Sequence, residues 1–211
     1  MGDRTFRGGV HPDGWKELTK EIPLTPYAPV GDLVYMTSQH IGKPAVPVVK
    51  KGDPVLVGQI IAEASGFISA NVVSSVSGTV KAIEPRPTAS GAMGQAIVVA
   101  NDGAYTTVEG FGRETDVDSL SNQEILARVK AAGIVGMGGA GFPTHVKLTV
   151  KEPEKIKYII ANGAECEPYI TCDDQLMQTK SKEIVAGMEL ILRLFPNAER
   201  TDRRLPPRYQ N

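Results

Sequence analysis

The chain has 211 residues, of which 41% are hydrophobic and 22% are charged, an ordinary balance for a globular protein of one or two domains. Its formal net charge of −1 supplies no basic field for nucleic acid or an anionic membrane, and no apolar run approaches the roughly 20 residues of a membrane helix. We expect no secretory signal, and the two cysteines suggest a reducing compartment, not a disulfide scaffold.

Short, mostly β-branched runs between about residues 30 and 105 predict strands separated by turns. The runs are Asp32–Thr37, Ala45–Val49, Val55–Val57, Gln59–Ala62, Ala70–Val73, Gly78–Ile83 and Gln95–Val99. The segment Val49–Gln59, which contains the turn Lys51–Pro54, and the segment Ser77–Ile83 give this part a pattern that resembles biotinyl and lipoyl carrier domains. The resemblance implies a small barrel-sandwich hybrid.

A carrier domain needs a lysine at the tip of the hairpin that joins its two halves. The tip is predicted near Ala64–Ser69, and the sequence has no lysine from Pro54 through Val80. We therefore predict an unmodified domain, and a carrier function is disfavoured. Upstream of it, we expect Phe6, Trp15 and Tyr27 to anchor the N-terminal arm onto the barrel.

A helix is predicted over Ser121–Ala132. Ser121 is a suitable N-cap, Glu124 lies where a capping box places its acidic partner, and Gly133 follows the predicted end. Apolar residues at helical spacing give this helix one buried face.

The next segment, Gly136–Lys147, concentrates four glycines within six positions. Glycine permits close approach of the backbone, and successive N–H groups in such a loop can cradle a phosphate. Pro143 favours a helix that begins there, and Lys147 can add a positive charge. A Walker A loop is excluded because no Gly-Lys-Ser/Thr follows, and a full strand, which a Rossmann fingerprint requires, does not precede. A tight turn between packed elements remains the alternative.

An apolar run over Ile156–Ala161 predicts a buried strand, and the polar residues Asn162, Glu165 and Glu167 come directly after it. Polar groups at the carboxyl end of such a strand lie where α/β sheets bind ligands. The two glutamates alternate along an extended segment, so their side chains should point to opposite sides. A solvated acidic turn is the alternative.

The residues that follow predict a helix. Asp173 and Asp174 suit a first turn, where the helix dipole favours acids, and Ile184 to Phe195 recur at helical spacing as a core face.

The segments Gly136–Lys147 and Asn162–Tyr169 together resemble the RnfC family of the Rnf electron-transport complex and the NADH-oxidising subunit of respiratory complex I. Gly8–Pro12 and Asp173–Met177 also match the Rnf family. The resemblance implies a two-part α+β chain. An N-terminal arm and barrel-sandwich hybrid (1–110) would precede the start of an α/β flavin- and NADH-binding domain of the complex I type (111–199).

The same resemblance implies cofactor-binding residues in both segments. In the glycine segment they are Gly136, Gly138, Gly139, Ala140, Gly141, Phe142 and Lys147. Of these, Gly136, Gly138 and Lys147 would hold FMN, and Gly139, Ala140 and Phe142 would lie toward NADH. Asn162 and Glu165 would lie near the flavin and Glu167 would meet NADH. Met137 and Ala164 stand where the respiratory subunit has arginine and aspartate, which removes two polar flavin contacts. No catalytic or metal-ligating residue is predicted.

The family's [4Fe–4S] centres each need four thiolates, so two cysteines cannot hold one, and these centres are expected only in a C-terminal part absent from this sequence. Residues 200–211 are expected to be a disordered or non-native tail of a truncated or frame-shifted product. We expect such a fragment to be inactive and to bind FMN weakly or not at all.

For the complete protein, the resemblance implies electron transfer between NADH, FMN and [4Fe–4S] centres in ferredoxin:NAD oxidoreduction. It would be a peripheral protein on the cytoplasmic face of the bacterial plasma membrane, without a membrane span. Its partners would be the other subunits of an ion-translocating complex, NAD(H) and, indirectly, ferredoxin, with no nucleic acid. Two alternatives stay open: a flavin-dependent cobalamin reductase of a microcompartment, and a cofactor-free scaffold subunit of a related quinone reductase.

Overall fold

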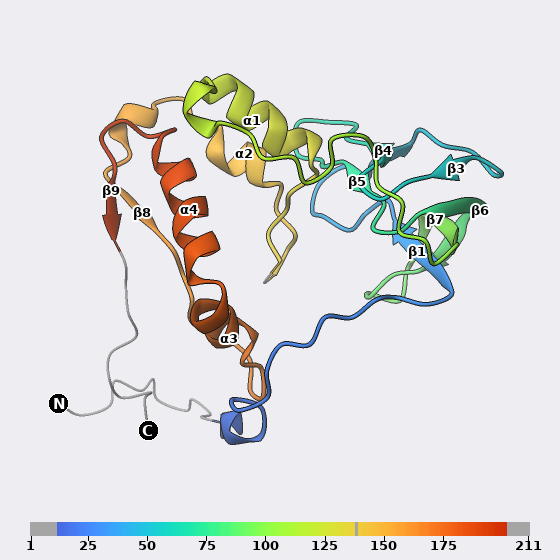
Figure 1. The fold of residues 1–211 in the computed structure, drawn as a ribbon, viewed down its shortest axis with the longest axis horizontal. Coiled ribbons are helices and arrows are strands. Elements are labelled where there is room, and N and C mark those ends of the chain that lie inside the picture. The colour runs from blue at the N-terminus through green and yellow to red at the C-terminus, as the bar shows by residue number, and fades with distance from the viewer. Residues whose placement is uncertain (1–11, 138, 202–211) are drawn as a thin grey trace. The chain divides into compact units, whose positions relative to one another are not determined.

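The computed structural model describes residues 12–137 and 139–201. Within these residues the chain forms two compact units (Figure 1). One, the barrel unit, is Ala28–Glu152. The other, the terminal unit, combines residues 12–27 with residues 153–201.

Two antiparallel sheets make up most of the barrel unit. The four-stranded sheet has the order β1-β7-β6-β3, and the three-stranded sheet has the order β2-β4-β5. Their strands are β1 (Asp32–Met36), β2 (Val46–Pro47), β3 (Pro54–Val55), β4 (Ile60–Glu63), β5 (Val72–Val73), β6 (Gly78–Pro87) and β7 (Met93–Asn101). The predicted barrel-sandwich hybrid is confirmed.

The core of this unit contains residues of both sheets, and most of its side chains are β-branched. Val55, Ile61, Val80, Ile97 and Val99 are almost completely buried in one cluster. In β7 the consecutive residues Ala96 to Val99 are all buried. Because successive side chains of a strand point to opposite faces, both faces of the middle of β7 are covered.

Several strand boundaries differ from those predicted. The hairpin of β6 and β7 is longer than its apolar runs because residues 84–87 pair with 93–96 beyond the core. In contrast, β2, β3 and β5 have two residues each, because their neighbouring residues turn away from the short ladders.

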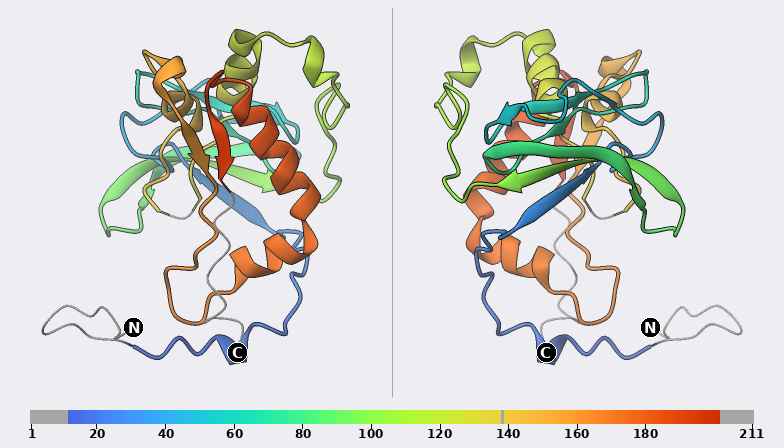
Figure 2. Two further views of the ribbon diagram at one scale, coloured as in Figure 1. Left: turned by 90° about the vertical axis from the view of Figure 1, so that its left-hand side faces the viewer. Right: turned by 90° about the vertical axis from the view of Figure 1, so that its right-hand side faces the viewer.

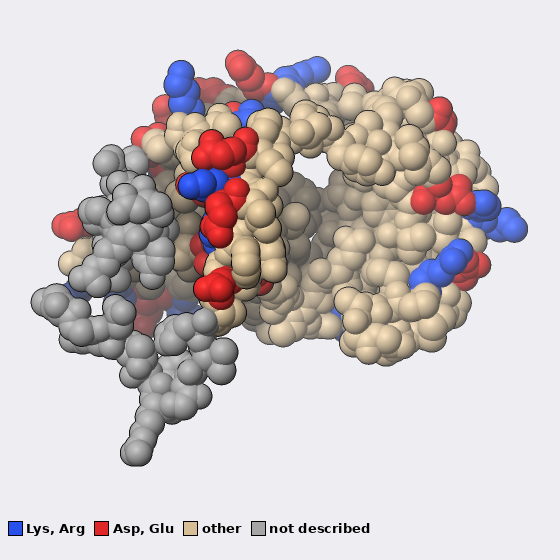
Figure 3. All heavy atoms as spheres, turned by 90° about the horizontal axis from the view of Figure 1, so that it is seen from below, with Lys and Arg blue, Asp and Glu red and all other residues tan. Residues whose placement is uncertain are grey.

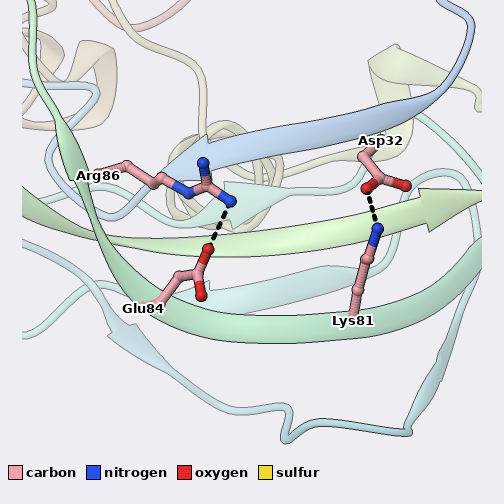
Figure 4. A network of polar contacts seen from close by, with 4 residues as sticks. All are labelled: Asp32, Lys81, Glu84 and Arg86. Carbon is pink, nitrogen blue, oxygen red and sulfur yellow. Dashed lines mark hydrogen bonds and ion pairs between the residues drawn. The ribbon is translucent and has the colours of Figure 1, made fainter.

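Strand β3 pairs only with the first two residues of β6, and the rest of that edge of β6 carries charged residues. Lys81 pairs with Asp32 of β1 at 2.5 Å, and Arg86 pairs with Glu84 at 2.5 Å (Figure 4). All four side chains are substantially exposed, so each pair contributes at most about 1 kcal/mol. Charges on an exposed strand also discourage edge-to-edge association.

The barrel unit ends with a 3₁₀ turn, η2 (Val117–Ser119), and two helices that lie side by side, α1 (Asn122–Ala131) and α2 (Thr144–Leu148) (Figure 1). Helix α1 has the predicted capping box: Ser121 Oγ accepts from the Glu124 amide, and the Glu124 carboxylate accepts from the Ser121 amide at 2.8 Å. Gly133, with φ of 65°, follows the end of the helix as predicted.

The terminal unit contains a parallel pair of strands, β8 (Tyr158–Ile160) and β9 (Glu199–Thr201), which lie side by side (Figure 2). It also contains the 3₁₀ turns η1 (Lys16–Leu18) and η3 (Pro153–Lys155). The helix predicted after the acidic residues is two helices, α3 (Cys172–Thr179) and α4 (Ser181–Leu192), because Lys180 leaves the helical conformation. Met188 and Phe195 of the predicted core face are buried, and so is Leu194, which was not predicted. Ile184, at the start of that face, is exposed, so the prediction is wrong for this residue.

Polar contacts hold the N-terminal arm within the terminal unit. Residues 14–20 bond to residues 167–175 of this unit, and Lys16, Thr19 and the backbone of residues 14 and 20 make these bonds. The expected contact of Trp15 and Tyr27 with the barrel stays a prediction, because the barrel belongs to the other unit. Phe6 lies outside the described residues.

On the face drawn in Figure 3, acidic and basic side chains are interspersed among uncharged residues. Among the helices of residues 12–137 and 139–201, none has the length and apolar character of a membrane-spanning segment. The predicted domain boundaries at 110 and 199 stay a prediction, and most of the predicted tail, residues 202–211, lies outside the described residues.

Candidate functional site

The glycine loop, residues 136–142, is closed at its base by backbone pairing. The Gly136 amide donates to the Phe142 carbonyl oxygen at 2.9 Å, and the Thr144 amide donates to the Ile134 carbonyl oxygen at 2.9 Å. Val135 and Pro143 form an antiparallel bridge beside these bonds. The loop is therefore the tip of a short hairpin that leads from α1 into α2.

The middle of this loop is exposed. Met137 is 93% exposed, and Gly139 and Ala140 are also exposed. Within the described residues, the amide N–H groups of Met137, Gly139 and Ala140 donate to no acceptor, and a β-carbon at Gly139 would meet no atom within 4 Å. These amides are available to an anion. Gly138, which was predicted to bind FMN, lies outside the described residues.

Gly141 and Ala140 also contact the barrel. Gly141 is buried with φ of 62°, and a β-carbon there would lie 2.9 Å from the Gln39 carbonyl oxygen. The Ala140 carbonyl oxygen accepts from the Ile41 amide at 3.1 Å. Glycine at position 141 is thus explained by packing, whereas its predicted cofactor contact stays a prediction.

Helix α2, which follows the loop, begins one residue later than predicted and is short. Pro143 is the residue before α2, not its first residue, because the bridge to Val135 keeps it extended. With five residues, α2 contributes little dipole, so any charge for a phosphate must come from Lys147, whose side chain is exposed. Burial lowers the pKa of the neighbouring His145, and the charge of Lys130 lowers it further.

Beside the loop, the barrel unit has a cavity of about 350 Å³ with a largely apolar lining. It lies between the end of α1 and residues of the barrel, and Met137 is the residue of the glycine loop that reaches it. Gln39, His40 and Asn71 supply its polar side chains.

The acidic segment, residues 162–169, belongs to the terminal unit. Asn162 turns back on its own chain, where its Oδ1 accepts from the Ala164 amide at 3.1 Å. Glu165 and Glu167 have different partners, and the predicted contacts of all three residues with flavin or NADH stay predictions.

Glu165 caps helix α3 from outside the helix. Its Oε1 accepts from the amide of Asp173 at 2.5 Å and from the amide of Asp174 at 3.4 Å. Thr171 occupies the N-cap position of α3, but its side chain accepts no hydrogen bond from these amides, so Glu165 provides the cap. The potential ligand atoms of Glu165, Cys172 and Asp173 lie within 4.8 Å of one another. Since Glu165 is engaged with the helix amides, this grouping is explained by the cap.

Glu167 receives a hydrogen bond from the thiol of Cys166, Sγ to Oε2, at 2.8 Å. This bond raises the pKa of Cys166, and its desolvation and the nearby carboxylate charges act in the same direction. The thiol is therefore held in its protonated form.

Sequence patterns did not reveal the residues that hold these two segments. Lys16 donates to two carbonyl oxygens of the acidic segment and its neighbour, and Gln39–Ile41 support the glycine loop. Both are contacts between residues about 100 or more positions apart, and no local periodicity marks them.

Comparisons with known proteins match both parts of the chain. Residues 4–104 match the family model described as the RnfC barrel sandwich hybrid domain, and residues 129–201 match the Nuo51 FMN-binding domain. The fold and the candidate loop thus define a class of protein in which a barrel-sandwich hybrid domain precedes a domain of the FMN-binding type.

The chain belongs to the RnfC family of electron-transport proteins, and it matches the N-terminal part of its relatives. It is 45% identical over 91% of its length to the C subunit of the proton-translocating ferredoxin:NAD(+) oxidoreductase complex of Clostridium ljungdahlii. It is 43% identical over 90% of its length to the C subunit of the Na(+)-translocating ferredoxin:NAD(+) oxidoreductase complex of Acetobacterium woodii. It is 40% identical over 90% of its length to the C subunit of the ion-translocating oxidoreductase complex of Pseudomonas aeruginosa.

The matched region covers 42%, 43% and 25% of these three relatives, so the chain spans less than half of each. None of the three names supports the cobalamin reductase or the quinone reductase alternative. The relatives belong to complexes of several subunits, and the family resemblance extends to FMN binding.

Proposed function

We propose that this chain contributes the phosphate-binding loop for FMN in the C subunit of an ion-translocating ferredoxin:NAD(+) oxidoreductase complex. The observation that supports the proposal is the glycine loop. At the tip of a closed hairpin it exposes the amides of Met137, Gly139 and Ala140, which have no acceptor among the described residues. Successive backbone N–H groups in a turn form a concave site for an anion.

The residues present fit the phosphate end of FMN. The loop provides space at Gly139, where no atom lies within 4 Å of a β-carbon position, and Lys147, in the last turn of α2, provides a positive charge. Charge-assisted hydrogen bonds from amides and an ammonium group are the contacts that phosphates prefer.

When bound, FMN would supply the hydride and single-electron chemistry, and this chain's residues would bind and orient it. Gly136 and Thr144 hold the base of the loop through their amides. By resemblance to the family, Asn162 and Glu165 would lie near the flavin, and Glu167 would meet NADH. No acid or base is required from the protein.

In the complete protein, electrons would pass between NADH, FMN and [4Fe–4S] centres. The partners would be the other subunits of the complex, NAD(H) and, indirectly, ferredoxin. The protein would be peripheral on the cytoplasmic face of the bacterial plasma membrane. The names of two relatives describe them as C subunits of ion-translocating ferredoxin:NAD(+) oxidoreductase complexes, which supports the part of this proposal that concerns ferredoxin, NAD and the other subunits.

The loop assignment is tested by titrating FMN against the purified chain and two lysine variants. Lys147→Ala should weaken FMN binding about fivefold to tenfold, the value of an exposed ion pair of about 1 kcal/mol. Lys151→Ala is the matched control, because Lys151 is equally exposed and lies just beyond α2. Equal FMN affinities of the two variants would contradict the assignment of Lys147.

A further inference from the structure

The barrel supplies a backbone platform for the glycine loop. The Ile41 amide donates to the Ala140 carbonyl oxygen at 3.1 Å, and a β-carbon at Gly141 would lie 2.9 Å from the Gln39 oxygen and 3.1 Å from His40 Cα. This side of the loop therefore rests directly on the main chain of residues 39–41. No side chain larger than hydrogen fits between the two backbones without displacing one of them.

The platform itself is fixed within the barrel. His40 is 7% exposed; its Nδ1 lies 3.1 Å from the Ile41 carbonyl oxygen, and its Nε2 lies 3.3 Å from the Ala70 amide. A neutral imidazole with its proton on Nδ1 satisfies both contacts, donating to the first and accepting from the second. The Thr37 amide donates to the Gln95 oxygen at 2.9 Å, which attaches the start of the same segment to β7.

In the terminal unit, the N-terminal arm makes a comparable contact with the acidic segment. Lys16 Nζ donates to the carbonyl oxygens of Glu167 at 2.7 Å and Ile170 at 2.5 Å. The Tyr169 amide donates to the Gly14 oxygen at 2.7 Å, and Thr19 Oγ1 donates to the Tyr169 oxygen at 2.5 Å. These bonds hold Tyr169 in a left-handed conformation, with φ of 66°.

We infer that the N-terminal region, residues 12–104, is a positioning element that sets the conformation of both loops. Its platform at residues 39–41 fixes the glycine loop, and its arm at residues 14–20 fixes the acidic segment. The region thus keeps a carrier-type fold and uses its backbone as a support. Loops held in one conformation before binding lose less entropy when a ligand arrives, so the support raises affinity. The identity of the ligands, FMN and NADH, rests on the proposed function, whereas the contacts that hold the two loops are independent of it.

The platform is tested with Gly141→Ala. Amide exchange at Ile41 and Gly136, whose N–H groups report the loop, should become about tenfold faster by NMR, and FMN affinity should fall by a similar factor. The control is Gly112→Ala, since Gly112 also has a positive φ, of 70°, but no atom lies within 4 Å of its β-carbon position. Exchange at Ile41 as slow as in the unchanged chain would overturn the inference for this loop.

The arm is tested with Lys16→Met, a change that removes two charged hydrogen bonds and keeps the aliphatic stem, so the fold should persist. Amide exchange at Tyr169 should become about tenfold faster and NADH should bind more weakly, while the thermal midpoint changes little. Lys20→Met is the control, because Lys20 contacts Gln175 through its carbonyl oxygen and not through its side chain. Unchanged exchange at Tyr169 in Lys16→Met would overturn the inference for the arm.

The two kinds of measurement separate this inference from the proposed function. If the unchanged chain binds neither FMN nor NADH, the proposed function fails for this chain, and the exchange rates alone decide whether the region positions the loops. The other outcome is that the chain binds FMN and NADH, and the variants accelerate amide exchange without changing the affinity for either ligand. In that case the contacts hold the loops but do not assist ligand binding, and the inference is wrong.

Discussion

Gly133 joins the end of α1 to the barrel, and replacing it with alanine should destabilise the barrel unit strongly. Gly133 has φ of 65°, and a β-carbon there would lie 2.4 Å from the Asn71 carbonyl oxygen and 3.2 Å from its carbon. The left-handed conformation costs alanine about 1–2 kcal/mol. The overlap with backbone adds about 1–3 kcal/mol, the usual cost of an enlarged side chain in a packed site.

The expected loss is therefore about 2–5 kcal/mol in the free energy of unfolding, measured by urea denaturation followed by circular dichroism. Gly103→Ala is the matched control, because Gly103 has φ of 71° and no atom lies within 4 Å of its β-carbon position. Gly103→Ala should cost the conformational part alone, about 1–2 kcal/mol. Equal losses in the two variants would refute the contact between Gly133 and Asn71.

Three further predictions concern single groups. Ser121→Ala should lower stability by about 1 kcal/mol in the same urea assay, since the capping box with Glu124 is lost. Burial lowers the pKa of His145, so this residue should titrate by NMR below its ordinary pKa of 6.5. Because folding disfavours the protonated form, the contribution of His145 to stability is full above pH 6.5 and is lost as the pH falls through the lower pKa of the folded state. Cys166 should react with iodoacetamide at pH 8 more slowly than after unfolding, and Glu167→Gln should speed the reaction, because the carboxylate raises the pKa of the thiol.

The sequence predicted the elements whose signals are local. Ser121 and Glu124 formed the predicted capping box because both partners lie within one turn. The strands β1 and β4 match the apolar runs that predicted them to within one residue at each end. The absence of a lysine at the hairpin tip also needed only the order of the residues.

Features that depend on distant parts of the chain were missed or wrong. Pro143 was predicted to begin a helix, but the bridge to Val135 keeps it outside α2. The bonds of Lys16 to the acidic segment were not predicted. A sequence pattern records spacing along the chain, and it does not indicate which carbonyl oxygens an ammonium group meets about 150 residues away.

For the candidate site, the sequence located both loops but not what each residue does there. Gly136, Gly139 and Gly141 look alike in the motif, yet their amides and their surroundings differ. Gly136 closes the hairpin, Gly139 faces open space, and Gly141 is packed against the barrel. Glu165 was chosen as a flavin contact, and its carboxylate caps α3 in the structure.

The most direct test of the account compares FMN with riboflavin, which lacks the phosphate, by NMR of the isotopically labelled chain. FMN should shift the amide signals of Met137, Gly139 and Ala140 at millimolar or lower concentration, and riboflavin should leave these signals in place. Equal shifts with both ligands, or no shift of these amides with FMN, would contradict the claim that the glycine loop binds a phosphate.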